Sequence, residues 1–486
     1  MNKTTFQIST QSFPPNRINP WKKGPRQSAR GSGFAVKVGK KSMVMTNAHV
    51  VSNNPFIHIR KWNSDKMYTA KIFDISPEVD LALLEVEDAD FWDAVPFFDI
   101  GDPPMKGDDV FVSGFPSGGN NASITKGIVS RIEPVSYNRA IKNMALQIDA
   151  AVNPGNSGGP IFHGTKKRYI AGVAFLTSVT TQLMCFMIPS FIVAHYIKTV
   201  EKIGKFPGVC DLMIRSSNLT NDMLRKAVLG DSTSSGMMVN EIAPTGPASM
   251  TLKPGDVITN IEGVDIGNDR MISLDYKCRP IKQTALSSTE IYEKVPYWHI
   301  IRMCNPNDII KLVVNRNGKT LNLKCRLTAC PDDLVPIIET RISMDYHILG
   351  GFVFTPLNYW HVFPDESSSV TIHSVLSKYK LYETAIDKYK EFEDHEIVIL
   401  SDIIPTKITV GAPVRPISRL VKINDEDVRN LNHVKKVANG NKDVLTLEFD
   451  DHQIIKIDMN DSYNQITKQI QGDLKTGGNI NPNDYP

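Results

Sequence analysis

The chain has 486 residues, of which 41% are hydrophobic and 22% are charged, and its formal net charge is +3. This length predicts about three domains, because a single hydrophobic core stops growing well below it. The nearly balanced charge gives no electrostatic argument for a nucleic-acid partner. No stretch approaches the roughly 18 apolar residues that a membrane helix needs, so the composition indicates a soluble globular protein without a membrane partner.

Two features bear on the compartment. The N-terminus lacks the apolar segment of a secretory signal, and no transit peptide is evident. The six cysteines are scattered, without a C-x-x-C pair or histidines at zinc spacing. We therefore expect reduced thiols, no metal or other cofactor, and a location in the cytosol or the nucleus. Secretion through a non-classical signal is the alternative.

Short apolar runs separated by polar turns predict an all-β region between Gly31 and Leu176. A helix follows, with Ser190 as the expected N-cap. Its apolar face is formed by Phe191, Ala194, Ile197 and Val200. Gly204 and Pro207 then predict a domain boundary.

The second half contains two similar segments, DVITNIEGVDIGN at 256–268 and SRLVKINDEDVRN at 418–430. Both consist of an apolar strand, a tight turn and a polar stretch ending in Asn, which indicates a duplicated small domain. Asn317-Gly318 between two apolar runs predicts a type I′ hairpin. After about Met459, a short amphipathic stretch leads to a Gly/Asn/Pro-rich tail that we expect to be disordered.

The segment at 153–160, NPGNSGGP, contains the candidate nucleophile Ser157. A serine hydroxyl needs an adjacent base, and it must stand where backbone N–H groups converge on the developing oxyanion. Flanking glycines allow the backbone conformations of such a turn. The structural alternative is a glycine-rich turn with an incidental serine.

His49 ends one apolar strand, and Asp80 stands directly before another in DLALLEV. Taken singly, each would more often be structural. Together with Ser157 they give the order His, Asp, Ser of chymotrypsin-like double barrels. The segment also fits G-x-S-x-G, the nucleophile elbow of α/β-hydrolases, but those enzymes place Asp and His after the serine. The strand–turn–helix context is missing too, so the elbow is rejected.

With these residues in place, the chain resembles the HtrA/DegP-type serine proteases. The matching motifs are GSGF at 31–34, TNAHVV around His49, DLALLEV from Asp80, SGFP at 113–116, GIVS at 127–130, and DAAV at 149–152 running into NPGNSGGP. LKPGDVI at 252–258 is similar to the PDZ signature of this family. GGFVFTPL at 350–357, IVILS at 397–401 and the lead-in Asn19-Pro20-Trp21 are similar to the plant-type Deg proteases with two PDZ domains.

The resemblance implies a mainly β chain, with a chymotrypsin-like double β-barrel protease domain followed by two PDZ-type domains. The implied parts are an N-terminal arm (1–30), the protease domain (31–203), a first PDZ domain (204–330), a divergent second one (331–460) and a C-terminal tail (461–486).

It also implies roles for individual residues. Ser157 would be the nucleophile, His49 the general base and then acid, and Asp80 the residue that fixes the imidazole. The N–H groups of Gly155 and Ser157, helped by Asn156, would form the oxyanion hole.

A second implied group of residues lines the substrate pocket. Ala151 would lie at its base, and Phe175, Leu176 and Thr177 beside it. Ala151 offers no acid to pair with Lys or Arg, so we expect cleavage after medium aliphatic residues. In the first PDZ domain, Asp211 in the candidate carboxylate loop would repel a peptide C-terminus, so internal segments or assembly are the expected roles. The second PDZ domain is even less suited to hold a free C-terminus.

The activity implied is that of an ATP-independent serine endopeptidase acting on unfolded or damaged proteins. Gly39-Lys40-Lys41-Ser42 departs from a P-loop, because Phe34 stands where its first glycine is required. Peptide segments at the PDZ domains and a trimer-based homo-oligomer are the implied partners. Phe6, Phe13 and Trp21 are candidates for the subunit contact, unless they pack on their own barrel. The alternative function is a PDZ scaffold or chaperone with little proteolysis.

Overall fold

The computed structural model divides the chain into two compact units, one of Met1–Ser12 with Gln27–Cys330 and one of Phe13–Arg26 with Pro331–Pro486. The structure describes residues 1–13, 21, 26–52, 56–117, 119, 121–137, 141–164, 168–176, 185–230, 234–275, 277–282, 285, 292–330, 334–336, 345–358, 361, 389–440 and 443–476. Among these residues, no helix has both the length and the apolar character needed to cross a membrane.

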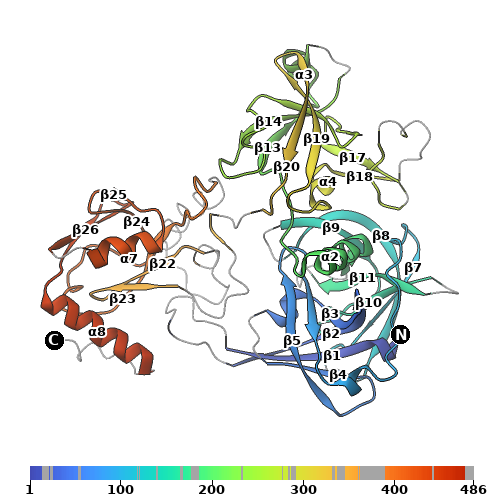
Figure 1. Ribbon diagram of the computed structural model, residues 1–486, viewed down its shortest axis with the longest axis horizontal. Coiled ribbons are helices and arrows are strands. Elements are labelled where there is room, and N and C mark those ends of the chain that lie inside the picture. Colours follow the sequence, from blue (N-terminus) through green and yellow to red (C-terminus); the bar gives the residue numbers. More distant parts are fainter. Residues whose placement is uncertain are drawn as a thin grey trace. The chain divides into compact units, whose positions relative to one another are not determined.

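The first unit begins with a closed six-stranded barrel (Figure 1). In barrel order its strands are β1 (Thr5–Ser12), β2 (Gln27–Val38), β3 (Lys41–Thr46), β6 (Leu81–Glu85), β5 (Met67–Ser76) and β4 (Phe56–Lys61). The short helices η1 (Asn2–Thr4), α1 (Ala48–Val51) and η2 (Ala89–Trp92) lie between strands or before them.

Strand β1 closes this barrel, because it pairs with β2 on one side and with β4 on the other. Phe6 on β1 is fully buried, with its ring centroid 4.9 Å from that of Phe91. The expectation of a separate arm over residues 1–30 therefore fails for β1 and for the start of β2. Phe6 packs inside its own barrel and is not available for a subunit contact.

A second closed barrel follows. Its strands, in barrel order, are β10 (Pro160–His163), β11 (Tyr169–Leu176), β12 (Cys185–Pro189), β9 (Ile141–Ile148), β8 (Ser123–Tyr137) and β7 (Asp109–Gly114). The predicted helix is α2 (Ser190–Ile203), and Gly204 ends it with φ 89°. The cap position falls on Pro189, with Ser190 as the first helical residue, so the predicted N-cap is one residue off.

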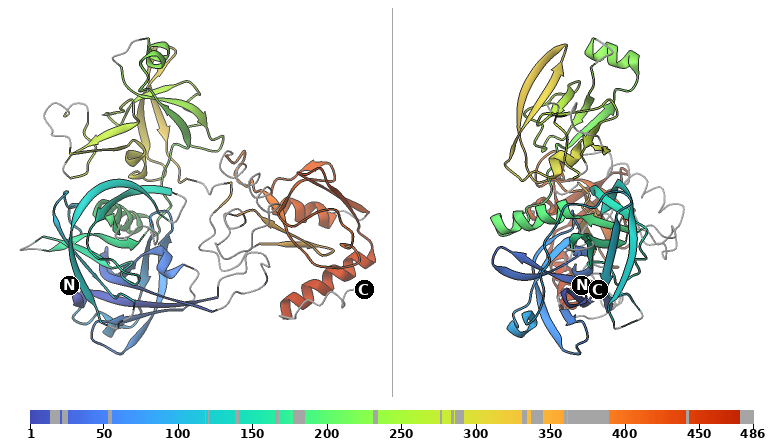
Figure 2. Two further views of the ribbon diagram at one scale, coloured as in Figure 1. Left: turned by 180° about the vertical axis from the view of Figure 1, so that it is seen from behind. Right: turned by 90° about the vertical axis from the view of Figure 1, so that its right-hand side faces the viewer.

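A third sheet completes the first unit (Figure 2). It contains β13 (Ile214–Asn218), β14 (Met237–Ile242), β15 (Val257–Ile261), β19 (Ile309–Arg316) and β20 (Lys319–Arg326), with β16 (Val264–Asp265) paired to β15. Beside it lie β17 (Met271–Leu274), β18 (Glu293–Pro296), α3 (Asp222–Leu229) and α4 (Trp298–Arg302). Asn317 and Gly318 both have positive φ, 53° and 78°, as the predicted type I′ turn requires.

The second unit contains one sheet in the order β21 (His347–Leu349), β22 (Phe352–Pro356), β23 (Val398–Ile403), β24 (Ser418–Ile423), β26 (Val444–Phe449) and β27 (Ile454–Asp458). β25 (Glu426–Asp427) pairs with β24 as β16 pairs with β15. The two similar sequence segments therefore form the same local structure. Helices α7 (Leu431–Gly440) and α8 (Asp461–Thr476) accompany the sheet.

Helix α8 corrects the expected boundary of the C-terminal tail. Its Ile466 and Ile470 are buried in a cluster with Ile348 and Ile404, so residues 461–476 belong to the folded second unit. The amphipathic pattern of this stretch therefore signals a packed helix. Residues 477–486 lie outside the described part of the chain.

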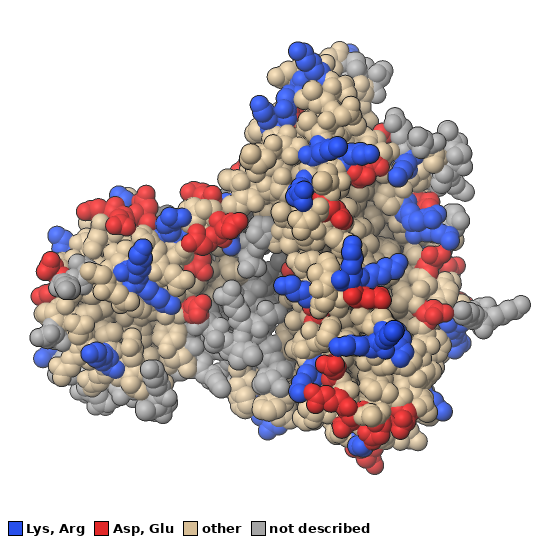
Figure 3. Space-filling model, in the orientation of Figure 1, with Lys and Arg blue, Asp and Glu red and all other residues tan. Residues whose placement is uncertain are grey.

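Lys and Arg side chains are interspersed with Asp and Glu over the face shown in Figure 3. This arrangement agrees with the small net charge of +3.

Candidate active site

His49 and Asp80 form a hydrogen-bonded pair in the first barrel. His49 lies in the one-turn helix α1 after β3, and Asp80 lies in the turn before β6. The Nδ1 atom of His49 is 2.8 Å from Oδ2 and 3.1 Å from Oδ1 of Asp80, and the His49 backbone N–H donates to Oδ1 at 3.0 Å. The Asp80 side chain is 2% exposed and that of His49 37%. A carboxylate that accepts from Nδ1–H leaves Nε2 with a lone pair that can act as a base.

The backbone of Asp80 is held in an uncommon conformation. Its φ is +51°, in the left-handed region that non-glycine residues seldom adopt. Its carbonyl accepts a hydrogen bond from Nδ2 of Asn47 at 2.9 Å, and Asn47 is fully buried. The sequence analysis did not single out Asn47. Its only signal was a polar residue at the buried end of the strand that leads to His49.

Two aromatic rings lie in the core near Asp80. Burial and the charge of Asp80 together raise the pKa of Tyr137 well above its usual value. The Tyr137 ring centroid is 4.8 Å from that of Phe175, which is 3% exposed and also neighbours Phe186. Phe175 is therefore packed in the core near Asp80, and its expected place beside the substrate pocket stays a prediction.

The loop that carries Ser157 lies against the strand that leads to His49. Ser157 is 8% exposed, and its carbonyl accepts from the Ser32 N–H at 2.8 Å. A Cβ atom on Gly158 would stand 2.3 Å from Oγ1 of Thr46 and 3.0 Å from the backbone nitrogen of Asn47. Gly158 has φ +84°, so no other residue fits this approach without strain.

The backbone carbonyls of this loop are all engaged. Two carbonyls accept from within the loop: Asn153 from the Asn156 N–H (3.0 Å) and Asn156 from the Gly159 N–H (2.9 Å). The Pro154 carbonyl accepts from the Ser117 N–H (2.7 Å). Ser32 donates to the other two, from its Oγ to the Gly155 carbonyl (2.7 Å) and from its N–H to the Ser157 carbonyl (2.8 Å). Among the described residues, the Gly155 and Ser157 N–H groups have no such acceptor. These are two of the three amides that the sequence analysis expected to bind an oxyanion. The third, that of Asn156, is used inside the loop.

The expected pocket residues are only partly described. Ala151 is exposed, and its carbonyl accepts from Oγ1 of Thr125 at 2.9 Å. Leu176 ends β11, with its backbone opposite Cys185. Thr177 lies outside the described residues.

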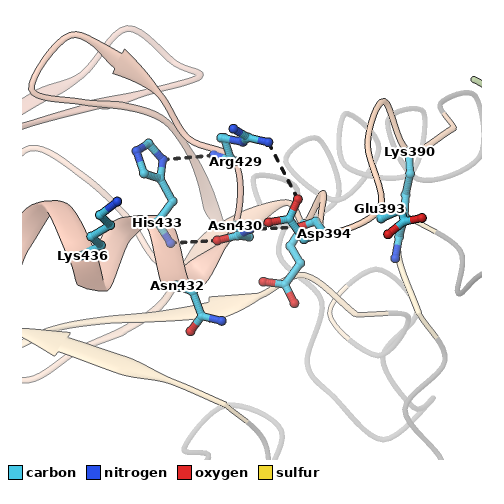
Figure 4. Close-up of a pocket in the computed structure, with 9 residues that line it drawn as sticks. Lys390, Glu393, Asp394, Arg429, Asn430, Asn432, His433 and Lys436 are labelled. Atoms are coloured by element: carbon cyan, nitrogen blue, oxygen red, sulfur yellow. Dashed lines mark hydrogen bonds and ion pairs between the residues drawn. The ribbon is translucent and has the colours of Figure 1, made fainter. Parts of the chain in front are cut away.

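A cavity of about 420 Å³ lies at the start of α7 in the second unit (Figure 4). Asn430 caps the helix, because its Oδ1 accepts from the His433 N–H at 2.7 Å, while its Nδ2 donates to Asp394 at 2.8 Å. Glu396 accepts from the Leu431 N–H at 3.1 Å. The Leu431 and His433 N–H groups at the helix terminus therefore already have side-chain acceptors, Glu396 and Asn430.

Comparisons with known proteins agree with this geometry. Residues 31–171 match the family model of the trypsin-like peptidase domain, and residues 335–473 match that of the PDZ domain. The chain is 31% identical to the putative protease Do-like 3, mitochondrial, of Arabidopsis thaliana, over 97% of this chain and 78% of that protein. It is also 31% identical to the protease Do-like 2, chloroplastic, of the same plant, over 90% of this chain and 68% of that protein.

A solved structure of the HtrA-type protease AlgW with tripeptide has the same fold, with a TM-score of 0.50. It covers 68% of this chain and 95% of AlgW, at 22% identity.

The double barrel, the PDZ domain and these relatives define a serine endopeptidase, as the sequence predicted. The chain belongs to the Do-like family of serine proteases, also called HtrA or Deg proteases.

The expected compartment is wrong. Three relatives that are 31% identical over 90% or more of this chain carry mitochondrial or chloroplastic in their names, which contradicts the cytosol or nucleus. Transit peptides are amphipathic and rich in Arg and Ser, and they need no long apolar segment. The lack of an apolar segment therefore says nothing about these organelles.

Proposed function

We propose that this endopeptidase cleaves unfolded or damaged proteins without ATP, through a triad of His49, Asp80 and Ser157. The observation that carries the proposal is the pair of amides left without an acceptor, Gly155 and Ser157 N–H, in a loop packed beside the His49–Asp80 pair. Two converging donors are what a tetrahedral intermediate of acyl transfer requires.

In this mechanism Ser157 Oγ attacks the scissile carbonyl carbon while His49 Nε2 takes its proton. Asp80 stabilises the imidazolium, and the two free amides bind the oxyanion. His49 then gives the proton to the leaving amine, and water hydrolyses the acyl-enzyme by the same steps in reverse order. Buried Asp80 holds the His49 ring through Nδ1 in both steps.

We infer a preference for medium aliphatic residues before the cleaved bond. Ala151 contributes a methyl group where a Lys- or Arg-specific pocket needs a carboxylate. Asp149, two residues earlier, already accepts from the Ile128 N–H. Mapping the products of a cleaved protein checks this preference, and cuts mainly after Lys or Arg would contradict it.

Assembly and compartment are proposed on family grounds. We propose a trimer-based homo-oligomer, for which Phe13, 43% exposed, is the remaining aromatic candidate at the N-terminus. The molar mass in solution tests it. We also propose an organellar location, which a fluorescent fusion of the full-length protein tests.

The test of the activity is cleavage of casein without ATP by the wild type and by Ser157→Ala. We expect cleavage by the wild type alone, because only the variant lacks the nucleophile. Equal cleavage by both would contradict the triad. If neither cleaves, even with peptide activators, the function would instead be that of a PDZ scaffold or chaperone.

A further inference from the structure

Ser32 in β2 makes four hydrogen bonds from a fully buried position. Its N–H donates to the Ser157 carbonyl (2.8 Å), and its Oγ donates to the Gly155 carbonyl (2.7 Å). The same Oγ accepts from the Phe115 N–H (2.8 Å), and the Ser32 carbonyl accepts from Thr46 Oγ1 (2.7 Å). No part of the catalytic mechanism uses this side chain.

These bonds join three segments that are distant in sequence. Through its hydroxyl, Ser32 connects β2, the loop that follows β7 and the loop that carries the nucleophile. The contact is tight, because a Cβ atom on Gly155 would stand 2.5 Å from the Phe115 carbonyl and 2.8 Å from the Ser117 nitrogen. Both loops are thus held in one arrangement around a single buried oxygen.

The orientation of the loop amides follows from peptide geometry. The C=O and the N–H of a trans peptide point in opposite directions, and the described peptides are all trans. The Pro154 carbonyl is held by Ser117, so the Gly155 N–H points away from that loop. The Gly155 carbonyl is held by Ser32, and the Asn156 carbonyl by Gly159. The Pro154 and Asn156 carbonyls share their peptides with the Gly155 and Ser157 N–H groups, so the bonds from Ser117 and Gly159 fix these two amides directly. The bond from Ser32 fixes the Gly155–Asn156 peptide that lies between them.

We propose that Ser32 is a positioning residue of the oxyanion site. Its hydroxyl fixes the Gly155–Asn156 peptide and ties it to Phe115, which holds the two neighbouring peptides so that the Gly155 and Ser157 N–H groups converge before substrate arrives. This inference rests on the proposed triad and deepens it, because it assigns to a strand residue the preorganisation on which the rate depends.

Loss of the hydroxyl would leave two buried groups, the Phe115 N–H and the Gly155 carbonyl, without partners. Unsatisfied buried polar groups are costly, so the two loops would separate or rotate to find new partners. The Ser117–Pro154 bond joins the same two loops and would loosen with them. The Gly155 N–H would then no longer be held toward the oxyanion.

The experiment compares kcat and KM of wild type and Ser32→Ala on a peptide substrate found by mapping casein products. It also measures the inhibition constant of a peptide boronic acid with the same sequence, which forms a tetrahedral adduct with an active serine. Removing one oxyanion donor lowers kcat by about 10²- to 10³-fold. We expect Ser32→Ala to lower kcat by about 10- to 100-fold, with KM within about threefold, and to weaken the boronate by a similar factor.

The matched control is Ser113→Ala. Ser113 is also fully buried in this unit, but its hydroxyl bonds to Oγ1 of Thr5 and not to the nucleophile loop. It should match Ser32→Ala in unfolding midpoint while keeping the wild-type kcat. Exposed Ser117 provides a second test that does not disturb a buried site. Ser117→Pro removes the amide donor to Pro154 and should lower kcat, whereas Ser117→Ala keeps the donor and should not.

The outcomes separate the two proposals. If the wild type neither cleaves nor binds the boronate, the triad and the role of Ser32 fall together. If the wild type does both and Ser32→Ala equals it in kcat and in boronate affinity, only the role of Ser32 is overturned. The role of Ser32 is also overturned if two results occur together: Ser32→Ala loses kcat only in proportion to a lowered unfolding midpoint, and Ser117→Pro keeps the wild-type kcat.

Discussion

His299 in α4 is 3% exposed, and its ring centroid is 5.3 Å from that of Phe191 in α2. Burial lowers its pKa from 6.5 to about 4, and the charge of Arg302 acts in the same direction. A hydrogen bond with the Cys278 backbone opposes the shift. The imidazole is therefore neutral in the folded chain at neutral pH.

This shift has a predictable effect on stability. As pH falls, the unfolded chain binds the proton before the folded chain does. The free energy of unfolding therefore decreases between pH 6.5 and about pH 4, and this group does not change it above pH 6.5. At pH 5 the penalty is about 2 kcal/mol, from 1.4 kcal/mol for each pKa unit. The unfolding free energy of the wild type should therefore fall between pH 7.5 and pH 5, and that of His299→Gln should fall by about 2 kcal/mol less. Urea denaturation of both proteins at the two pH values measures this difference.

The comparison must be between variant and wild type, since His347 in the second unit also has its pKa lowered by burial to about 4. Equal losses in the two proteins would show that His299 is not protonated on unfolding in this range.

At the scale of elements, β13 and α4 border a cavity of about 450 Å³ in the first unit. β13 is the edge strand of its sheet, where PDZ domains add a peptide. Asp211, directly before this strand, is paired with Arg302 at 3.0 Å, and the Arg302 guanidinium lies 4.1 Å from the ring centroid of Trp298. Arg302, a cation beside the candidate carboxylate loop, is thus already neutralised by Asp211.

We therefore predict that this domain does not distinguish a free peptide C-terminus from an amidated one. Asp211→Asn removes the partner of Arg302, whose side chain is only 14% exposed. A peptide carboxylate can then take the place of Asp211, so the variant should prefer the free C-terminus by about tenfold, the value of one modest charged hydrogen bond. Fluorescence anisotropy with paired peptides measures this.

The control is Asp269→Asn. Asp269 also borders the cavity, but its carboxylate accepts from the Met271 N–H. A wild type that already prefers free C-termini would contradict the prediction.

Sequence reasoning succeeded where a pattern has one physical cause. The I′ turn at Asn317-Gly318 and the duplicated strand pairs follow from local motifs, and the His49–Asp80 pair follows from the order of His, Asp and Ser motifs along the chain. It failed where tertiary context decides. Nothing local shows that Phe175 points into the core, that Ser32 reaches Gly155, or that residues 5–12 close a barrel, because each depends on strands brought together from far along the chain.

At the scale of the whole molecule, the chain passes between the two units three times. Residues 13–26 lie between β1 and β2 of the first unit but belong to the second. Trp21 joins a cluster with Ile348 and Ile470, and its ring centroid is 5.7 Å from that of Tyr346. Trp21 is thus part of the core of its own chain's second unit, which corrects its expected place in a subunit contact.

We predict that Trp21→Ala destabilises the second unit by about 2 kcal/mol, less than for a fully buried aromatic because the side chain is half-buried. Hydrogen exchange in α8 and β21 should rise, while exchange in the second barrel stays unchanged. Trp21→Phe keeps an aromatic ring and should recover most of the loss. Unchanged exchange in α8 would mean that Trp21 adds nothing to this core.

This division of the chain fixes an order in biosynthesis. The ribosome releases Trp21 long before Tyr346, so one residue of the second unit's core is made long before the residues that it contacts there. The barrels can close early, because β1 and β2 flank residues 13–26 and pair with each other. The core of the C-terminal unit is complete only when Trp21 packs against Tyr346 and the cluster with Ile348 and Ile470. A fragment beginning at Pro331 would leave the ribosome with a gap in its core that no later residue can fill.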